Sequence, residues 1–253
     1  MILYEHPFNE RIRTWLRLER LFIYLGSLIQ REELIDHHYA LHTLFEIMDV
    51  SSRSDLKGEI LGELDRQKQQ LVSLRGNPAI ADEGTLDKVI NQLQACYDSL
   101  NQQVNLRTGA ELTNNAWLMS VRNRMSIPGG TCEFDLPAYH AWLHYPAKER
   151  LANLYAWVAE LAPMADAITN LLQLLRDSGV LQKALATQGK FELPLPAGKT
   201  FQLLRILIDE RMGLIPEVSA NRLLISLHWF RQDASWKLVH AKEDIEFEFA
   251  ICA

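Results

Sequence analysis

The sequence predicts an α+β protein, a mainly helical domain plus a smaller antiparallel β-strand domain. In the first half of the chain, apolar residues recur at spacings of three and four, which is the period of an amphipathic helix. From Gly189 onward they alternate with polar residues, as in strands with one buried face. Because the helices come first and the strands last, the chain is predicted to be α+β.

The first half of the chain contains several segments with the helical period. The apolar positions of each segment fall mainly on one side, so each helix can bury one face against the others. The predicted helices cover residues 9–30, 41–48, 56–74, 86–104 and 112–125. The Pro128-Gly129-Gly130 turn ends the last of them, because proline fixes φ and the glycines permit positive φ.

The middle of the chain combines an extended segment with two helices. Residues 131–136 alternate between apolar and polar side chains and are predicted to be extended. A short aromatic helix follows over residues 137–144, and a longer apolar helix over residues 147–176. Pro163 should kink or divide the longer helix, because proline cannot donate the helical hydrogen bond.

Four strands are predicted in the last third, with short connections rich in Gly, Pro, Asn and Asp. They cover residues 191–195, 201–208, 223–227 and 245–251.

Composition excludes several classes of function. The 253-residue chain has a net charge of −6, which argues against general binding of nucleic acid. Cys96, Cys132 and Cys252 are scattered and form no CxxC motif, so a disulfide framework and a Cys-rich zinc site are not expected. No apolar stretch approaches the ~18 residues of a membrane span, and no secretory signal is evident. A cytoplasmic protein is therefore expected.

Several arginines lie together on predicted helices. Arg13, Arg17 and Arg20 are spaced by four and three and share a face opposite the apolar stripe. Arg122 and Arg124 precede the Pro-Gly-Gly turn, and Arg53 precedes another helix. Two interpretations remain open: a solvated helix face, or a basic surface that contacts a partner.

An enzyme using Cys132, His140 and His144 is the alternative interpretation. The two histidines are four residues apart and could bind zinc, but a zinc site needs further ligands. Cys132 beside His140 could form a thiol and base pair, but no third residue is evident to orient the histidine. A packed aromatic segment and a small apolar cysteine explain the same residues. We therefore predict no enzyme activity, no metal and no cofactor.

Two motifs resemble signatures of the ZapD family of bacterial cell-division factors. The first is the EHPFNE sequence at residues 5–10, followed by RTWLR at residues 13–17. The second is the block from Arg122 to His144, which contains SIPGG and FDLP. The resemblance implies a helical domain of residues 1–115 and 150–180, and a β-strand domain of residues 116–149 and 181–253.

The resemblance also implies a function. The family is expected to form cytoplasmic homodimers that bind the C-terminal tail of FtsZ and bundle its filaments at the mid-cell division ring. No nucleic acid or membrane partner is expected. The candidate partner-binding residues are Arg17, Arg20, Arg53, Arg122, Arg124, His140 and Arg222. The strand region matches the family's basic positions only in part, because Leu223 to Leu227 carry no cation.

Overall fold

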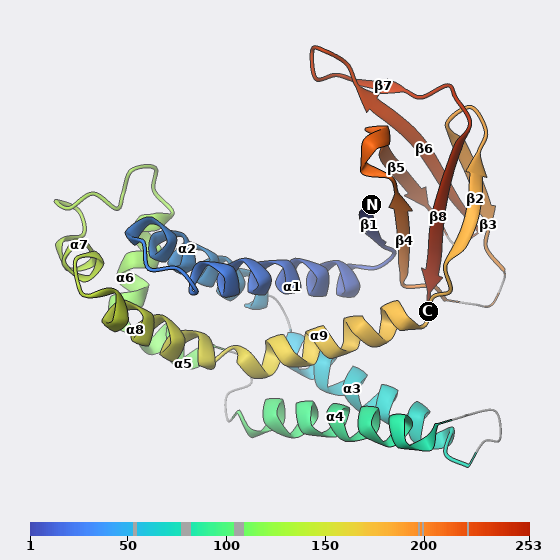
Figure 1. Cartoon of the computed structure of the whole chain (residues 1–253). Coiled ribbons are helices and arrows are strands. Elements are labelled where there is room, and N and C mark those ends of the chain that lie inside the picture. Colours follow the sequence, from blue (N-terminus) through green and yellow to red (C-terminus); the bar gives the residue numbers. More distant parts are fainter. Residues whose placement is uncertain (53–54, 77–81, 104–108, 197, 199, 222) are drawn as a thin grey trace. The chain divides into compact units, whose positions relative to one another are not determined.

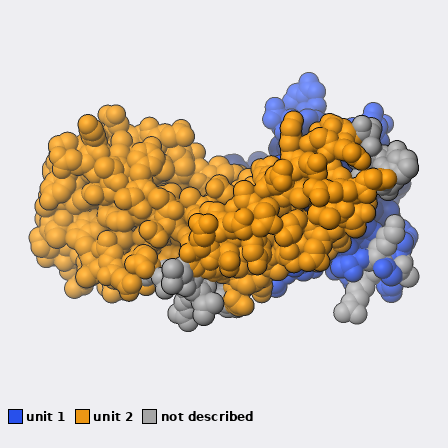
Figure 2. All heavy atoms as spheres, turned by 90° about the horizontal axis from the view of Figure 1, so that it is seen from below, with its two compact units in different colours: residues 1–14, 172–253 blue, residues 15–171 orange. Residues whose placement is uncertain are grey.

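The computed structural model describes residues 1–52, 55–76, 82–103, 109–196, 198, 200–221 and 223–253 (Figure 1). The chain divides into two compact units, which Figure 2 shows in different colours. Unit 1 comprises residues 1–14 and 172–253, and unit 2 comprises residues 15–171. Unit 2 is helical and the smaller unit 1 contains the strands, which confirms the predicted α+β class.

Unit 1 contains two antiparallel sheets. The first has the strand order β1-β4-β8-β2, and the second has the order β3-β6-β5, with β7 pairing the end of β6. The elements are β1 (Ile2–Pro7), β2 (Gln182–Ala186), β3 (Lys190–Pro194), β4 (Leu203–Ile208), the 3₁₀ helix η1 (Glu210–Met212), β5 (Ile215–Ala220), β6 (Leu224–Gln232), β7 (Leu238–His240) and β8 (Ile245–Cys252). The β2–β3 hairpin turns at Gln188 and Gly189, both with positive φ, as a two-residue hairpin turn requires.

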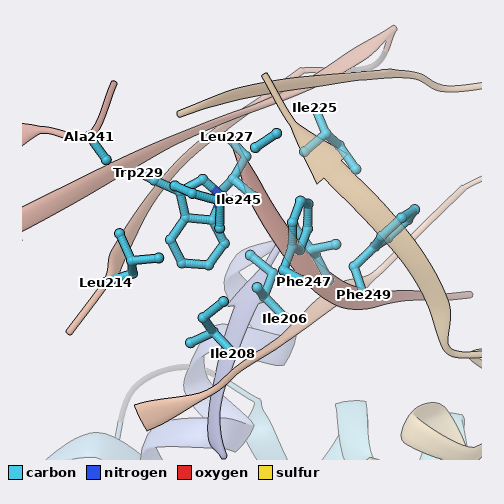
Figure 3. Close-up of a cluster of buried hydrophobic side chains, with 12 residues drawn as sticks. Ile206, Ile208, Leu214, Ile225, Leu227, Trp229, Ala241, Ile245, Phe247 and Phe249 are labelled. Atoms are coloured by element: carbon cyan, nitrogen blue, oxygen red, sulfur yellow. The ribbon is translucent and has the colours of Figure 1, made fainter. Parts of the chain in front are cut away.

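The core of unit 1 lies between the two sheets (Figure 3). Trp229 from β6 is fully buried, and its ring meets Phe247 of β8 edge to face, with 5.4 Å between ring centroids. Along β8 the buried residues Ile245, Phe247 and Phe249 alternate with Glu246 and other outward residues. Each large apolar side chain buried in this way stabilises the fold by about 1.5–3 kcal/mol.

Unit 2 is built from helices. Its elements are α2 (Leu34–Ser51), α3 (Leu56–Ser73), α4 (Glu83–Gln102), α5 (Ala110–Asn114), α6 (Ala116–Met125), α7 (Pro137–Leu143) and α8 (Ala147–Ala159). The helices α1 (Glu10–Leu28) and α9 (Ala162–Asp177) contribute residues to both units. Asp55, Asp82 and Asn115 cap three of the helices by accepting a backbone N–H in the first turn.

Arg150 connects three segments of unit 2. This arginine is only 5% exposed. Its Nε donates to Nδ1 of the buried His37 at 2.8 Å, and its two terminal nitrogens donate to the carbonyls of Leu143, Tyr145 and Glu32. The other ring nitrogen of His37 lies 2.8 Å from the Arg31 carbonyl. These bonds hold the turn between α1 and α2 against the turn between α7 and α8.

The structure corrects one sequence prediction. Residues 131–136 form turns rather than an extended strand, because the amides of Asp135 and Leu136 both donate to the Cys132 carbonyl. The domain boundaries that the resemblance implies stay a prediction, and the two units group the same residues in another way. Residues 116–149 form α6, α7 and the turns around them in unit 2, whereas residues 1–14 belong to unit 1. The expected division at Pro163 is present, since α8 ends at Ala159 and α9 begins at Ala162.

Candidate functional site

Arg122 and Arg124 lie in the last turn of α6, and each has a carboxylate partner. Arg122 bonds to Asp49 at the end of α2, and Arg124 lies 3.6 Å from Asp135. Their side chains remain 30% and 48% exposed. Cations also suit the end of a helix, where the helix dipole is negative. The two arginines are therefore available to a partner, but their charges are partly compensated.

His140 on α7 and His144, which directly follows this helix, are exposed neighbours. Their ring centroids are 4.5 Å apart, and Nδ1 of His144 donates to the His140 carbonyl at 2.8 Å. Within the described ranges, no group of three or more His, Cys, Asp and Glu side chains is arranged to hold a metal. The described part of the chain thus offers a histidine pair without the additional ligands that zinc requires.

Arg17 and Arg20 are exposed on the part of α1 that belongs to unit 2. Arg20 lies over the ring of Tyr24 at 5.9 Å from its centroid. Neither arginine forms an ion pair with another residue that the structure describes. They carry the least compensated positive charge among the candidate residues that the structure describes.

Arg53 and Arg222, the other two predicted partner-binding residues, lie outside the described residues. The described neighbours of Arg222 do line a cavity of about 750 Å³ in unit 1. At one edge of the cavity, the side-chain oxygen of Asn221 accepts the amides of Leu223 at 2.8 Å and Leu224 at 2.9 Å.

The first signature motif forms one wall of this cavity. His6, Pro7, Phe8 and Asn9 all line it, and Arg13 supplies a cation. The remaining lining residues are Leu195, Gly198, Thr200, Phe201, Ala220, Asn221 and Leu223. No carboxylate is present among these described residues. The cavity therefore combines apolar walls with positive charge.

The charge of the cavity depends on Arg13 more than on His6. Burial lowers the pKa of His6, and the positive charge of Arg13 lowers it further. His6 is therefore neutral at neutral pH. Arg13 lies 3.0 Å from the exposed Glu10, a pair that solvent screens. Sequence reasoning placed Arg13 on a basic helix face but missed this cavity, although the EHPFNE motif was a signal for the segment.

Comparisons with known proteins identify the family. The model of the ZapD family, described as a cell division protein, matches residues 16–228. The curated Cell division protein ZapD of Ralstonia pickettii is 46% identical over 253 residues, which cover all of this chain and 99% of that protein. The chain belongs to the ZapD family. The ZapD proteins of Cupriavidus pinatubonensis and a Janthinobacterium species are 45% and 44% identical, again over the whole chain.

Membership in the ZapD family assigns the chain to cell division, which confirms the predicted resemblance. Among the helices that the structure describes, none is long and apolar enough to cross a membrane. The two motifs that carried the resemblance have different surroundings: the first lines the cavity of unit 1, and the second covers the end of α6, the turn after it and α7 in unit 2.

Proposed function

We propose that the protein binds the C-terminal tail of FtsZ and, as a cytoplasmic homodimer, crosslinks FtsZ filaments into bundles at the mid-cell division ring. Full-length similarity to ZapD proteins supports this proposal, together with exposed arginines on an otherwise acidic protein. A tail that is disordered when free loses conformational freedom on binding, so a single contact is expected to be weak.

The proposed contact surface consists of the exposed cations. Arg17 and Arg20 support it most directly, because their charges have no ion-pair partner among the described residues. Arg122, Arg124 and His140 extend it on α6 and α7. Arg53 and Arg222 are included from the sequence alone. Arginine suits this function because its planar group binds carboxylates with two parallel hydrogen bonds.

The cavity in unit 1 is a second candidate site for the same tail. Its apolar walls and Arg13, without a lining carboxylate among the described residues, suit an acidic peptide that carries an apolar side chain. Leu223 at its edge is 70% exposed, so an apolar contact is available there.

Fluorescence anisotropy with a labelled FtsZ tail peptide tests the proposal and separates the two sites. Arg17→Glu combined with Arg20→Glu should weaken binding at least about tenfold if the α1 surface is used, because close like charges repel. Leu223→Asp should have this effect if the cavity is used. Arg75→Glu is the control. The Arg75 side chain is 50% exposed and pairs with Asp87, and it lies outside both sites.

Binding should also weaken as salt rises, because exposed charges are screened beyond a Debye length of about 8 Å at physiological ionic strength. Absence of binding to the tail peptide by the unmodified protein would contradict the proposed function itself. If the dissociation constant changes neither with salt nor with any of the charge substitutions, the proposed basic contact surface is contradicted, but tail binding itself is not.

Bundling requires two sites in one particle. A dimer converts the second tail contact into an intramolecular one, which can raise avidity by ~10²–10⁴. The unmodified protein should therefore raise the light scattering of FtsZ polymers, and it should not do so when FtsZ lacks its tail. Bundling of tailless FtsZ would refute the tail as the point of attachment.

The alternative, a metal- or thiol-dependent enzyme, predicts different results. It requires bound metal that is lost in His140→Ala, or a reaction abolished by Cys132→Ser. We expect Cys132→Ser to leave folding and tail binding nearly unchanged, because a free cysteine contributes mainly a small apolar contact. Metal analysis of the purified protein distinguishes the two proposals.

A further inference from the structure

The turn between β6 and β7 presents large apolar side chains to solvent. Figure 1 shows this loop projecting from the sheet of unit 1. Trp236 at its tip is 79% exposed, and Leu238 and Val239, which follow in β7, are 55% and 50% exposed. Tryptophan is among the residues that most often anchor protein interfaces.

Hydrogen bonds within the turn define the conformation of the tip. One oxygen of Asp233 accepts the amide and hydroxyl of Ser235 at 2.8 and 2.7 Å and the amide of Lys237 at 3.0 Å. The Asp233 amide also donates to the Lys237 carbonyl, and the Trp236 amide to the Asp233 carbonyl. These bonds hold Trp236 at φ +63°, a conformation that bulky residues rarely adopt. Such strain is typical of positions selected for function.

Unit 1 also contains a groove with the complementary character. It has a volume of about 500 Å³ and lies over β2, β4, β8 and η1. Leu185, Leu207 and Met212 provide apolar lining, and Glu246 and Glu248 provide carboxylates. Neither glutamate forms an ion pair with another described residue.

Three other charges border the groove: Asp209, Lys183 and the N-terminal ammonium of Met1, which lies 3.8 Å from the Glu210 carboxylate. Asp209 is already paired with Arg211. Lys183 lies opposite Glu248 in the β2–β8 register, without forming an ion pair in the described structure. The groove is therefore apolar with a net negative rim.

We propose that the β6–β7 tip of one copy docks in this groove on a second copy of the chain. Trp236 packs against the three apolar side chains, and the Lys237 ammonium pairs with Glu246 and Glu248. Lys237 has no ion-pair partner among the described residues. The exposure of Trp236 shows that it does not occupy the groove of its own chain.

The contact is weak by itself. A tryptophan buries roughly 150–250 Å², whereas a stable interface buries about 1,200–2,000 Å² in total. Two reciprocal contacts about a two-fold axis would double this area. The contact should form to the greatest extent where copies are already concentrated, as on the bundled filaments of the proposed function. It requires neither FtsZ nor tail binding.

Zero-length carbodiimide crosslinking of the full-length protein tests this contact without FtsZ. A dimer band on a denaturing gel should yield peptides that join Lys237 to Glu246 or Glu248. Trp236→Ala should reduce those peptides at least about tenfold, as expected for loss of an interface anchor. Phe134→Ala is the matched control, because Phe134 is also 79% exposed at a turn but lies in unit 2. It should leave the crosslink unchanged.

Charge reversal provides a second test by sedimentation velocity at high protein concentration. Lys237→Glu should weaken self-association, and adding Glu246→Lys and Glu248→Lys should restore it. The proposal is overturned if Lys237 crosslinks occur only in the monomer band, or if Trp236→Ala leaves the dimer crosslink unchanged. Failure of tail binding would leave these results unaffected, so the two proposals fail separately.

Discussion

Replacing Arg150 by methionine should destabilise the protein strongly. The substitution removes hydrogen bonds to His37 and to the carbonyls of Glu32, Leu143 and Tyr145. A buried polar group left without its partner costs about 1–3 kcal/mol. Arg150 forms no ion pair with another residue that the structure describes. Burying methionine in its place offsets part of this loss, because the arginine charge no longer has to be desolvated. We expect the free energy of unfolding to fall by about 3 kcal/mol, which is a large fraction of the roughly 5–15 kcal/mol typical of a native protein.

Urea denaturation followed by circular dichroism measures this loss. The midpoint should fall while the slope stays constant, because a change of slope would indicate altered cooperativity or an altered denatured state. Arg75→Met is the control, since the exposed Arg75–Asp87 pair should contribute no more than about 1 kcal/mol. A loss below 1 kcal/mol for Arg150→Met would refute the reasoning that these hydrogen bonds outweigh the desolvation of the charge.

Three further substitutions test other features. Burial lowers the pKa values of His6, His37 and His38 in the folded protein. The free energy of unfolding should therefore be highest above the unfolded pKa of 6.5 and decrease as the pH falls through the folded pKa values. His37→Gln should make this decrease smaller in urea midpoints measured from pH 7 to 5. Glu5→Gln should lower the free energy of unfolding by about 3 kcal/mol in the same assay, because the partly buried Glu5 accepts two 2.8 Å hydrogen bonds from Arg176. A loss below about 1 kcal/mol would show that this ion pair does not stabilise the fold as expected. Trp236→Asn should raise stability by about 1 kcal/mol, since asparagine tolerates positive φ, and a lower melting temperature would contradict the strain.

Buried residues could be predicted from the sequence where an apolar period extends along a long helix. Trp15, Leu18 and Leu25 recur at helical spacing within the helix predicted over residues 9–30, and all three are at most 2% exposed. Short elements lacked such a pattern. The six residues of β1 are mostly half-buried, and their place in the sheet depends on pairing with β4 about 200 residues later. Local periodicity carries no information about such a partner.

The alternation of apolar and polar residues predicted a strand wrongly where the backbone forms hydrogen bonds within a turn. Cys132, Phe134 and Leu136 show the period of a strand, but the Cys132 carbonyl accepts two amides from its own turn. Phe134 is consequently 79% exposed. The candidate arginines show the same limitation. Their positions could be predicted, but Asp49, which pairs with Arg122, is 73 residues away in sequence.

The contacts of the charged residues determine which substitutions can report on binding. Glu5 and Arg150 are largely buried and make several hydrogen bonds, so a binding defect after their replacement could come from lost stability as well as from a lost contact. Arg17 and Arg20 are exposed, and their charges have no carboxylate partner among the described residues. Changing exposed residues of this kind usually alters stability by no more than about 0.5 kcal/mol. A binding defect in Arg17→Glu or Arg20→Glu can therefore be attributed to the lost contact itself, whereas a defect in Glu5→Gln cannot.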